Sequence, residues 1–250
     1  MGASPTPCAS RAAGVDGLEH FVSVLQLSDS AFPSGRYTLS YGLEPLLQDG
    51  LLTAPAAGAT LVSLLADTIR FGVAPSDGRA LACTHRAIGL DGGIDLALIA
   101  KVDRRLTAVK IPLEARRAST RTGRAVIGTA VATIGGAVLD DYAQLVEGGG
   151  SPGNHAVVVG LLSSVLGVPR PEAVTGELYA FAAGWAAAAV RLGLLDHRAA
   201  QGLLHRSRSV IAEAALTALV DDLGRISSCT PLLDVMAMRH EQAELRLFAS

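Results

Sequence analysis

The sequence predicts an all-α fold: a single helical domain of about ten helices behind a flexible N-terminal tail. Half of the 250 residues are apolar but only 4% are aromatic, so the core is built mainly from Ala, Leu and Val, which suits closely packed helices. Val, Ile and Thr never alternate with polar residues in runs bounded by hairpin turns, so strands have little support. Neither a repeat of fixed period nor a convincing linker divides the chain, which favours one domain.

The tail is predicted over residues 1–17 and the domain over residues 18–250. The tail segment contains Pro5, Pro7 and three glycines without an apolar run, so it is not a signal peptide. The first helix is expected over residues 18–27, and it ends near a Phe-Pro-Ser-Gly turn at residues 32–35.

A second helix is expected over residues 39–48. Thr38 precedes it, and a threonine hydroxyl in that position can accept a hydrogen bond from an unpaired N–H of the first turn. Gly50 is placed to end the helix in the left-handed conformation.

The remaining helices are bounded by Gly, Pro or Asp. Pro112 is expected to open one of them, because the missing N–H of proline costs nothing in a first turn. The Gly-Gly-Gly-Ser-Pro-Gly stretch at 148–153 is the clearest loop. Pro169 and Pro171 mark the start of an Ala-rich helix that a neighbour can approach closely. The other helices are expected near residues 56–72, 77–89, 94–109, 155–167, 172–192, 197–220 and 231–247.

Charge and composition exclude several classes of protein. The net charge of −2 is spread along the chain, so no nucleic-acid partner is expected. Three distant cysteines argue against a disulfide framework. The longest uncharged stretch, 125–139, is interrupted by glycines and is shorter than the roughly 20 apolar residues of a membrane span. We therefore expect a cytoplasmic protein without a membrane partner, whose high mean hydropathy of +0.38 is consistent with a permanent protein interface.

Most catalytic motifs are absent from the sequence. It has no phosphate-binding Gly-x-x-x-x-Gly-Lys-Ser/Thr loop, no Gly-x-Ser-x-Gly and no Cys-x-x-Cys. His240 and Glu241 resemble the start of a zinc-protease motif, but Glu244 stands where the second histidine is needed. His197 and His205 share one predicted helix, where a nickel site is conceivable and solvated histidines are the more common case. We expect no enzyme activity, no cofactor and no metal site.

Three parts of the chain resemble the UreF family of urease accessory proteins. The first comprises residues 25–27 (Leu-Gln-Leu), 33–35 (Pro-Ser-Gly) and 40–44 (Ser-Tyr-Gly-Leu-Glu). The last comprises residues 231–232 (Pro-Leu), 239–241 (Arg-His-Glu) and 246–250 (Arg-Leu-Phe-Ala-Ser). A moderate match lies between them, at residues 114–116 (Glu-Ala-Arg), 119, 123 and 155–160. The resemblance spans residues 25–250, nearly the whole chain.

This resemblance implies an all-α protein that forms a homodimer and has no chemistry of its own. It implies a scaffold that bridges UreD (UreH in some species) and the nickel-carrying GTPase UreG. The assembly docks on apo-urease, and nickel enters the active site in a step coupled to GTP hydrolysis. The resemblance therefore implies a chaperone of metallocentre assembly that takes part in nickel insertion.

The resemblance also implies two partner-facing sets of residues. The GTPase-facing candidates come from the first matching part and from a basic position near the end of the Ala-rich helix: Pro33, Gly35, Tyr41, Glu44 and Arg191. The candidates that face UreD/UreH come from the C-terminal part: Arg239, His240, Glu241, Arg246 and Phe248.

Two alternatives stay open at this point. A helical adaptor or regulator unrelated to urease would have the same composition. A small metal-dependent hydrolase would use His240, Glu244 and another histidine, and it would bind metal tightly in the isolated protein.

Overall fold

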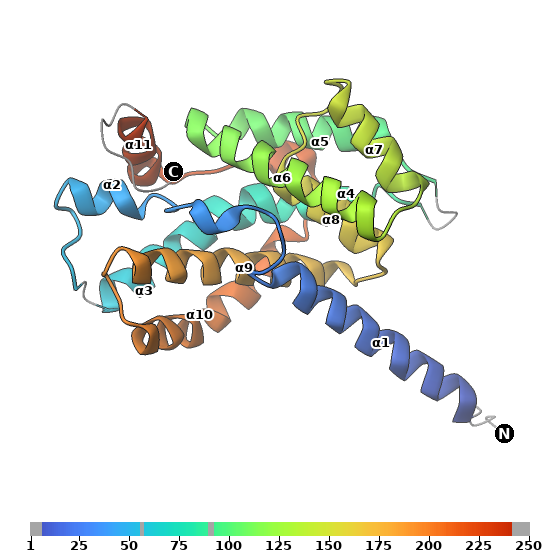
Figure 1. The fold of residues 1–250 in the computed structure, drawn as a ribbon, viewed down its shortest axis with the longest axis horizontal. Helices are drawn as coiled ribbons and strands as arrows, with labels where there is room; N and C mark the ends of the chain where they lie inside the picture. The colour runs from blue at the N-terminus through green and yellow to red at the C-terminus, as the bar shows by residue number, and fades with distance from the viewer. Residues whose placement is uncertain (1–6, 56–57, 90–92, 242–250) are drawn as a thin grey trace.

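The computed structural model describes residues 7–55, 58–89 and 93–241. These residues form helices and no β-strand, which confirms the predicted all-α fold (Figure 1). In chain order the helices are α1 (Pro7–Ser28), η1 (Arg36–Thr38), α2 (Leu43–Gln48), α3 (Gly58–Asp67), η2 (Thr68–Gly78), α4 (Arg79–His85), α5 (Leu96–Val109), α6 (Leu113–Thr133), α7 (Ala137–Glu147), α8 (His155–Val165), α9 (Arg170–Arg191), α10 (His197–Ala218), η3 (Leu223–Arg225) and α11 (Pro231–His240).

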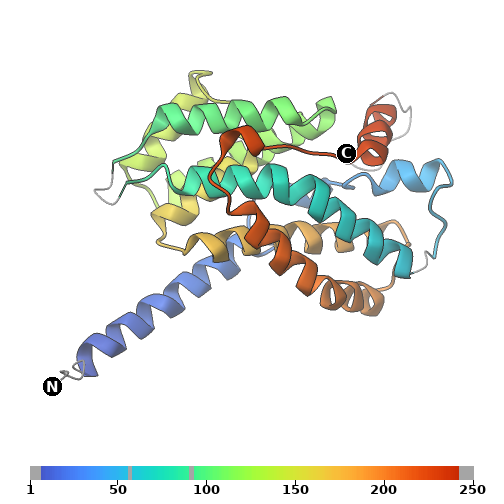
Figure 2. The same cartoon turned by 180° about the vertical axis from the view of Figure 1, so that it is seen from behind.

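Helix α8 forms the centre of the domain. Figure 1 shows α5, α6 and α7 on one side and α9 and α10 on the other, and α8 packs on α4, α6 and α9. Its side chains from His155 to Ser163 are all buried. Gly160 allows the close approach of α4, because a Cβ there would lie 2.6 Å from the Leu81 carbonyl oxygen. Figure 2 shows the same arrangement from behind.

Helix α9 is long and apolar enough to cross a membrane by length and composition. Its position in the fold accounts for this composition. It packs on α1, α4, α8 and α10, and Trp185 and the small residues around it are buried in the core. The sequence prediction of an Ala-rich helix with close neighbours is thereby confirmed.

Helices α3, η2 and α4 follow one another without a break, and η2 is a π-helix that contains Pro75. Proline has no N–H, so the Phe71 carbonyl four residues earlier loses its ordinary helical partner. The N–H of Cys229 donates to that carbonyl at 2.8 Å, and the N–H of Ser227 donates to the Pro75 carbonyl at 3.0 Å. The extended segment after α10 is therefore fixed along η2, and it leads the chain to α11.

Most predicted helices agree with the structure within a few residues. Gly50 has the expected left-handed φ of +71°, and α6 follows Pro112 directly. Helix α1 begins at Pro7, inside the segment predicted as a tail, and residues 1–6 lie outside the described part. Helix α11 ends at His240, so the predicted extension to 247 also falls largely outside it. Helix α7 was not predicted; Gly135 and Gly136, both with positive φ, separate it from α6.

The prediction that Thr38 caps a helix over residues 39–48 is wrong. Residues 36–38 form the short 3-10 helix η1, and the Thr38 hydroxyl donates to the Gly35 carbonyl at 3.3 Å. Tyr41 and Gly42 both adopt positive φ, which no helix accommodates, so α2 begins only at Leu43.

Candidate functional site

The segment between α1 and α2 is a sharp turn that contains three of the predicted site residues. Pro33 and Gly35 are exposed in it, and the φ of +73° at Gly35 favours glycine. Tyr41 has a φ of +53°, which is uncommon for a bulky residue and stores backbone strain. Its ring packs edge-on against Phe181 of α9, with 5.2 Å between the ring centroids. Gly184 makes room for it, because a Cβ there would lie 2.6 Å from the Tyr41 hydroxyl oxygen.

Arg191, the predicted basic position, holds the same turn from the end of α9. Its Nη2 donates to the Leu39 carbonyl at 3.1 Å, and its guanidinium carbon lies 4.4 Å from the centroid of the Tyr37 ring. A cation–π contact of this kind contributes roughly 1 kcal/mol at an exposed site. The Tyr37 ring is 68% exposed. The pair therefore presents an aromatic ring beside a cation at the surface.

A buried charged cluster lies beneath the turn. The Arg36 Nη1 donates to Glu177 Oε2 of α9 at 3.0 Å and lies 3.1 Å from His155 Nε2 at the start of α8. The same Nε2 is 3.4 Å from Glu177 Oε2. Burial alone would raise the pKa of the Glu177 carboxyl, but the neighbouring Arg36 and His155 outweigh it and lower this pKa to about 2. Three elements far apart in the sequence are joined by this charge cluster.

A buried carboxylate on α5 fixes the start of α8. Asp103 Oδ2 accepts hydrogen bonds from the hydroxyls of Tyr142 (3.0 Å) and Ser151 (2.5 Å) and from the N–H of Gly153 (2.6 Å). Its Oδ1 accepts from the N–H and the side-chain amide of Asn154 at 3.0 and 2.6 Å. The glycine-rich loop predicted at 148–153 thus ends on a carboxylate that holds Asn154, the residue directly before α8.

Gly123 on α6 lets this loop approach. A Cβ at Gly123 would lie 2.0 Å from the Gly153 carbonyl oxygen and 2.8 Å from the backbone nitrogen of His155. Only glycine fits there, because backbone atoms cannot move aside as a flexible side chain can. The position of His155 therefore depends on Asp103 and Gly123, neither of which touches its ring.

A second charged cluster joins α11 to α2 and α6. The His240 Nε2 lies 3.2 Å from Glu44 Oε2, and its Nδ1 lies 2.9 Å from Glu114 Oε2. Glu44 is only 1% exposed, and the Gln48 side chain donates to its other oxygen at 3.1 Å. Glu241 completes the cluster, since its Oε1 accepts from the backbone N–H of Glu114 at 3.1 Å.

The ring of His240 faces a carboxyl group at each of its two nitrogens. A neutral imidazole has one N–H and one acceptor nitrogen, whereas an ionised carboxylate can only accept. Both contacts are hydrogen bonds only if the ring is an imidazolium or if one carboxyl is protonated.

A cavity of about 230 Å³ separates the two clusters. Arg36, His155 and Glu177 line one part of it, and Glu114 and His240 line another. Between them the walls are mainly apolar, and the Lys110–Asp77 ion pair (2.6 Å) also borders the space. Helix α11 forms one wall through Leu233, Asp234, Ala237 and His240.

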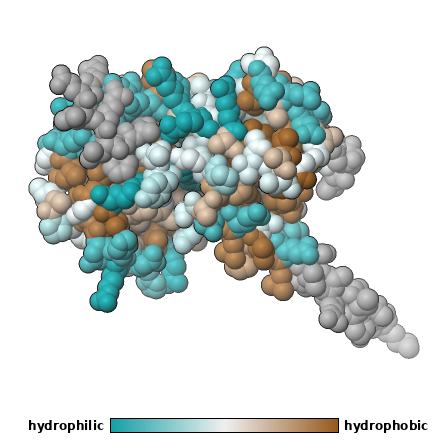
Figure 3. All heavy atoms as spheres, in the orientation of Figure 1, coloured by the Kyte–Doolittle hydropathy of each residue, from teal (hydrophilic) through white to brown (hydrophobic). Residues whose placement is uncertain are grey.

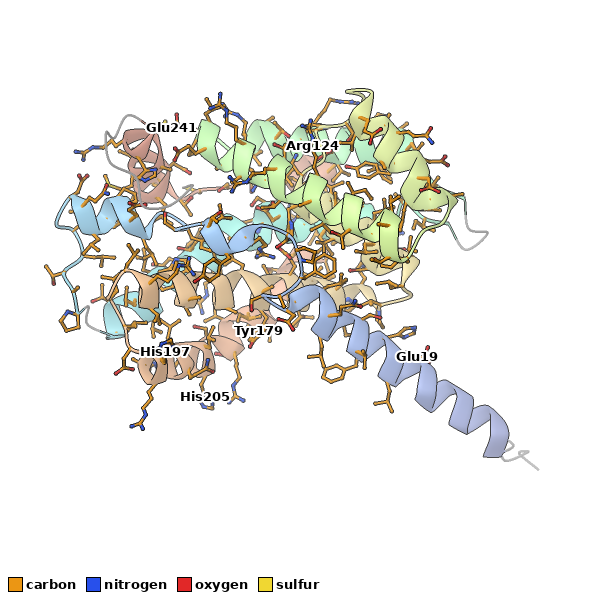
Figure 4. The ribbon with its side chains drawn as sticks, in the orientation of Figure 1. Glu19, Arg124, Tyr179, His197, His205 and Glu241 are labelled. Carbon is orange, nitrogen blue, oxygen red and sulfur yellow. The ribbon has the colours of Figure 1, made fainter. Side chains whose placement is uncertain are left out.

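The structure thus brings together residues from both predicted partner-facing sets. Tyr41 and Arg191 hold the turn, whereas the Glu44 carboxylate meets His240 of the other set rather than solvent. Arg239 is exposed and pairs with Asp49 at 2.7 Å. Figure 4 shows Glu241 near the end of α11. Arg246 and Phe248 lie outside the described residues.

Within the described part of the chain, no three His, Cys, Asp or Glu side chains are arranged to hold a metal ion. Figure 4 shows His197 and His205 on α10, and both are exposed. Both ring nitrogens of His240 already face carboxylates, and Glu244 falls outside the described residues. No observation favours the hydrolase alternative.

Sequence reasoning missed the residues that organise the site. Arg36, Asp103, His155 and Glu177 carry none of the predicted roles, yet all are buried or nearly so. One signal was available for Glu177, which is an isolated acid inside the Ala-rich helix; a charge in such a helix needs a partner.

We expect Glu177→Gln to remove a pH-dependent part of the stability. The folded-state pKa of about 2 lies below the ordinary value of 4.5. The contribution is thus complete above about pH 4.5 and is lost as the pH falls towards 2, on the order of 3 kcal/mol in all. Urea unfolding should show that the free energy of unfolding of the variant is well below that of the wild type at neutral pH. This difference should become smaller as the pH falls towards 2. Glu172→Gln, exposed on the same helix, is the control. A difference in the free energy of unfolding that does not change with pH would contradict the lowered pKa of Glu177.

Comparisons with known proteins confirm the resemblance found in the sequence. The model of the UreF family matches residues 56–208. The urease accessory protein UreF of Trichodesmium erythraeum is 31% identical over 92% of this chain and 96% of its own length. The proteins of that name from an Arthrobacter species and from Yersinia pseudotuberculosis are 28% and 26% identical over the same share of this chain. The chain belongs to the UreF family of urease accessory proteins.

Proposed function

We propose that this chain is a non-catalytic scaffold that bridges UreD/UreH and the GTPase UreG, so that nickel enters apo-urease in a GTP-dependent step. The observation that carries the proposal is that apolar faces remain uncovered on the two peripheral helices α1 and α11. Isolated soluble monomers rarely leave such faces open, and a protein that works in an assembly covers them with partners.

The uncovered face of α1 is a stripe at helical spacing. Leu18, Phe21, Val22 and Leu25 are between 53% and 66% exposed. Their offsets of three, four and seven residues place them on one side of the helix. Figure 1 shows α1 projecting from the body, and Figure 3 shows hydrophobic side chains gathered where it leaves.

The second uncovered apolar face is the outer face of α11. Leu232, Val235 and Met238 are exposed on it, and Arg239 stands beside them. We assign this face, together with Glu241 and the Arg246 and Phe248 that follow in the sequence, to UreD/UreH. An apolar centre with charged residues around it is the usual composition of a protein interface.

The GTPase-facing surface is assigned to the turn after α1. Pro33, Gly35 and Tyr37 are exposed there. Tyr41, with its strained backbone, and Arg191, which grips the turn from α9, set its shape. An exposed aromatic ring beside an arginine is a frequent centre of binding energy in interfaces.

The face of α1 is assigned to a second copy of the chain. It adjoins a groove of about 490 Å³ between the turn and helices α9 and α10, and Leu25 borders both. The groove wall from α9 includes the small residues Ala180, Ala183 and Ala187 together with Tyr179 and Arg191. A projecting apolar helix and a groove on the same molecule can pair reciprocally across a two-fold axis.

The bridging role is tested by urease activation. Urease is produced with the other accessory proteins, with and without this chain, and its nickel content and activity are measured. Both should depend on the chain. Equal nickel in its absence would overturn the proposal.

We expect Arg191→Ala to weaken binding of the GTPase about tenfold, because the turn loses its anchor and Tyr37 its cation. Calorimetry on folded protein measures the affinity, and circular dichroism confirms the fold. Arg198→Ala, exposed at the start of α10, serves as the control. Unchanged affinity in the Arg191 variant would show that the GTPase does not bind at this surface.

The dimer is tested with Phe21→Glu, which places a charge in the apolar stripe of α1. Light scattering after gel filtration should show a dimer for the wild type and a monomer for the variant. Leu216→Glu changes an equally exposed residue away from the groove and should leave the dimer intact. A wild-type monomer at micromolar concentration would contradict the assignment.

A further inference from the structure

We propose that the GTPase-facing surface continues from the turn after α1 onto three arginines of α6, and that the partner covers them with an acidic protein surface. The three are Arg117, Arg121 and Arg124, which together are called the α6 arginine row. The inference rests on the proposed function, because it names the chemistry that the partner presents at that surface. Its physical basis is a line of exposed cations beside the turn.

The α6 arginine row occupies the outer side of its helix. Arg117, Arg121 and Arg124 are spaced at four and three residues, so they lie on one side of α6, and all three are exposed. Gly128, the next residue on this side, is also exposed and has no side chain that could cover them. Helix α6 packs on α7, α8 and α11, and none of its buried residues belongs to the row.

The α6 arginine row adjoins the turn. The Arg121 Nη2 donates to the Thr38 hydroxyl oxygen at 3.5 Å, and Thr38 is the last residue of η1. The residue before it is Tyr37, whose exposed ring lies beside the guanidinium of Arg191. Figure 1 shows α6 next to the segment that leads from α1 to α2. A partner that covers the Tyr37 ring is therefore within reach of the row.

The charge of the α6 arginine row is not balanced within the described part of the chain. No carboxylate there lies within ion-pair distance of any of its three side chains. Glu114, at the start of α6, faces His240 instead. Two more carboxylates border this face: Glu147 shares a groove with the row, and Asp29 lies in the turn.

The face around the turn is thus positive on a chain that is negative overall. The row and Arg191 supply four cations, and Glu147 and Asp29 supply two anions, which leaves a surplus of two positive charges where the whole chain has a net charge of −2. A surface whose charge is opposite in sign to that of the whole molecule attracts partners of complementary charge.

Repulsion within the α6 arginine row is a further argument for a partner. Like charges three and four residues apart on a helix destabilise it, and salt screens them only in part. Carboxylates of a partner relieve this repulsion, and each can accept two parallel hydrogen bonds from a guanidinium. A nucleic acid is the less suitable partner, because domains that bind it usually carry a clear excess of positive charge.

Three double variants separate the charge of the row from its shape. Arg117→Glu with Arg121→Glu reverses the charge at two exposed positions. Arg117→Lys with Arg121→Lys keeps the charge but loses the planar donor group of arginine. Arg206→Glu with Arg208→Glu, at two exposed positions of α10, changes the net charge by the same amount as the first variant and is the matched control. Circular dichroism checks that each variant is folded.

The test measures the rates of association and dissociation between UreG and the full chain at several salt concentrations. In the wild type, association should slow roughly tenfold between about 50 and about 500 mM NaCl, because salt screens the attraction between exposed charges. The α6 glutamate variant should bind roughly a hundredfold more weakly at low salt, mainly through slower association, and its affinity should not fall as salt is added. The lysine variant should associate as the wild type does and dissociate faster. The α10 variant should keep the salt dependence of the wild type.

A wild-type association rate that does not depend on salt would overturn the acidic contact and leave the bridging role intact. An α6 glutamate variant that associates as fast as the wild type would do the same. A double-stranded DNA oligonucleotide that binds the wild type but not this variant at about 150 mM salt would assign the row to a nucleic acid instead. If UreG does not bind the wild type at any salt concentration, the bridging role fails and the acidic contact fails with it.

Discussion

The buried carboxylate of Asp103 is the interaction on which the rest of the structure depends. It gathers the N–H groups of Gly153 and Asn154 and the hydroxyls of Tyr142 and Ser151, so the glycine-rich loop has one conformation. That loop leads directly into α8 at the centre of the domain. Removing the carboxylate would leave several buried donors without a partner, which is the most damaging way to lose hydrogen bonds. The core helix and the charged cluster at its first residue therefore share one anchor.

The two charged clusters use ionisable groups to define the positions of the elements that they join. Arg36, His155 and Glu177 tie the turn after α1 to α8 and α9, while His240 ties α11 to α2 and α6. Apolar contacts alone would tolerate small shifts of these elements, whereas paired charges in a poorly solvated setting are satisfied in few arrangements. Such specificity suits an accessory protein that works within a larger assembly.

The sequence was sufficient for most of the helices and insufficient for the contacts between them. Helices such as α8 and α9 were predictable because proline, glycine and apolar runs act locally. Thr38 misled for the same reason: its local capping propensity was overruled by the left-handed backbone at Tyr41 and Gly42, which the contact with Phe181 stabilises. Motifs located the turn and Arg191, but nothing in the sequence pairs Glu44 with His240, which is 196 residues distant. Buried ion pairs are determined by tertiary packing, about which local sequence patterns carry no information.

The apolar stripe on α1 also has a consequence for the cell that makes the protein. The projecting helix α1 exposes Leu18, Phe21, Val22 and Leu25. On a copy without a partner, such an apolar surface promotes nonspecific association. If the stripe is covered by a second copy as proposed, copies in which it stays exposed would aggregate or be degraded, as happens to orphan subunits.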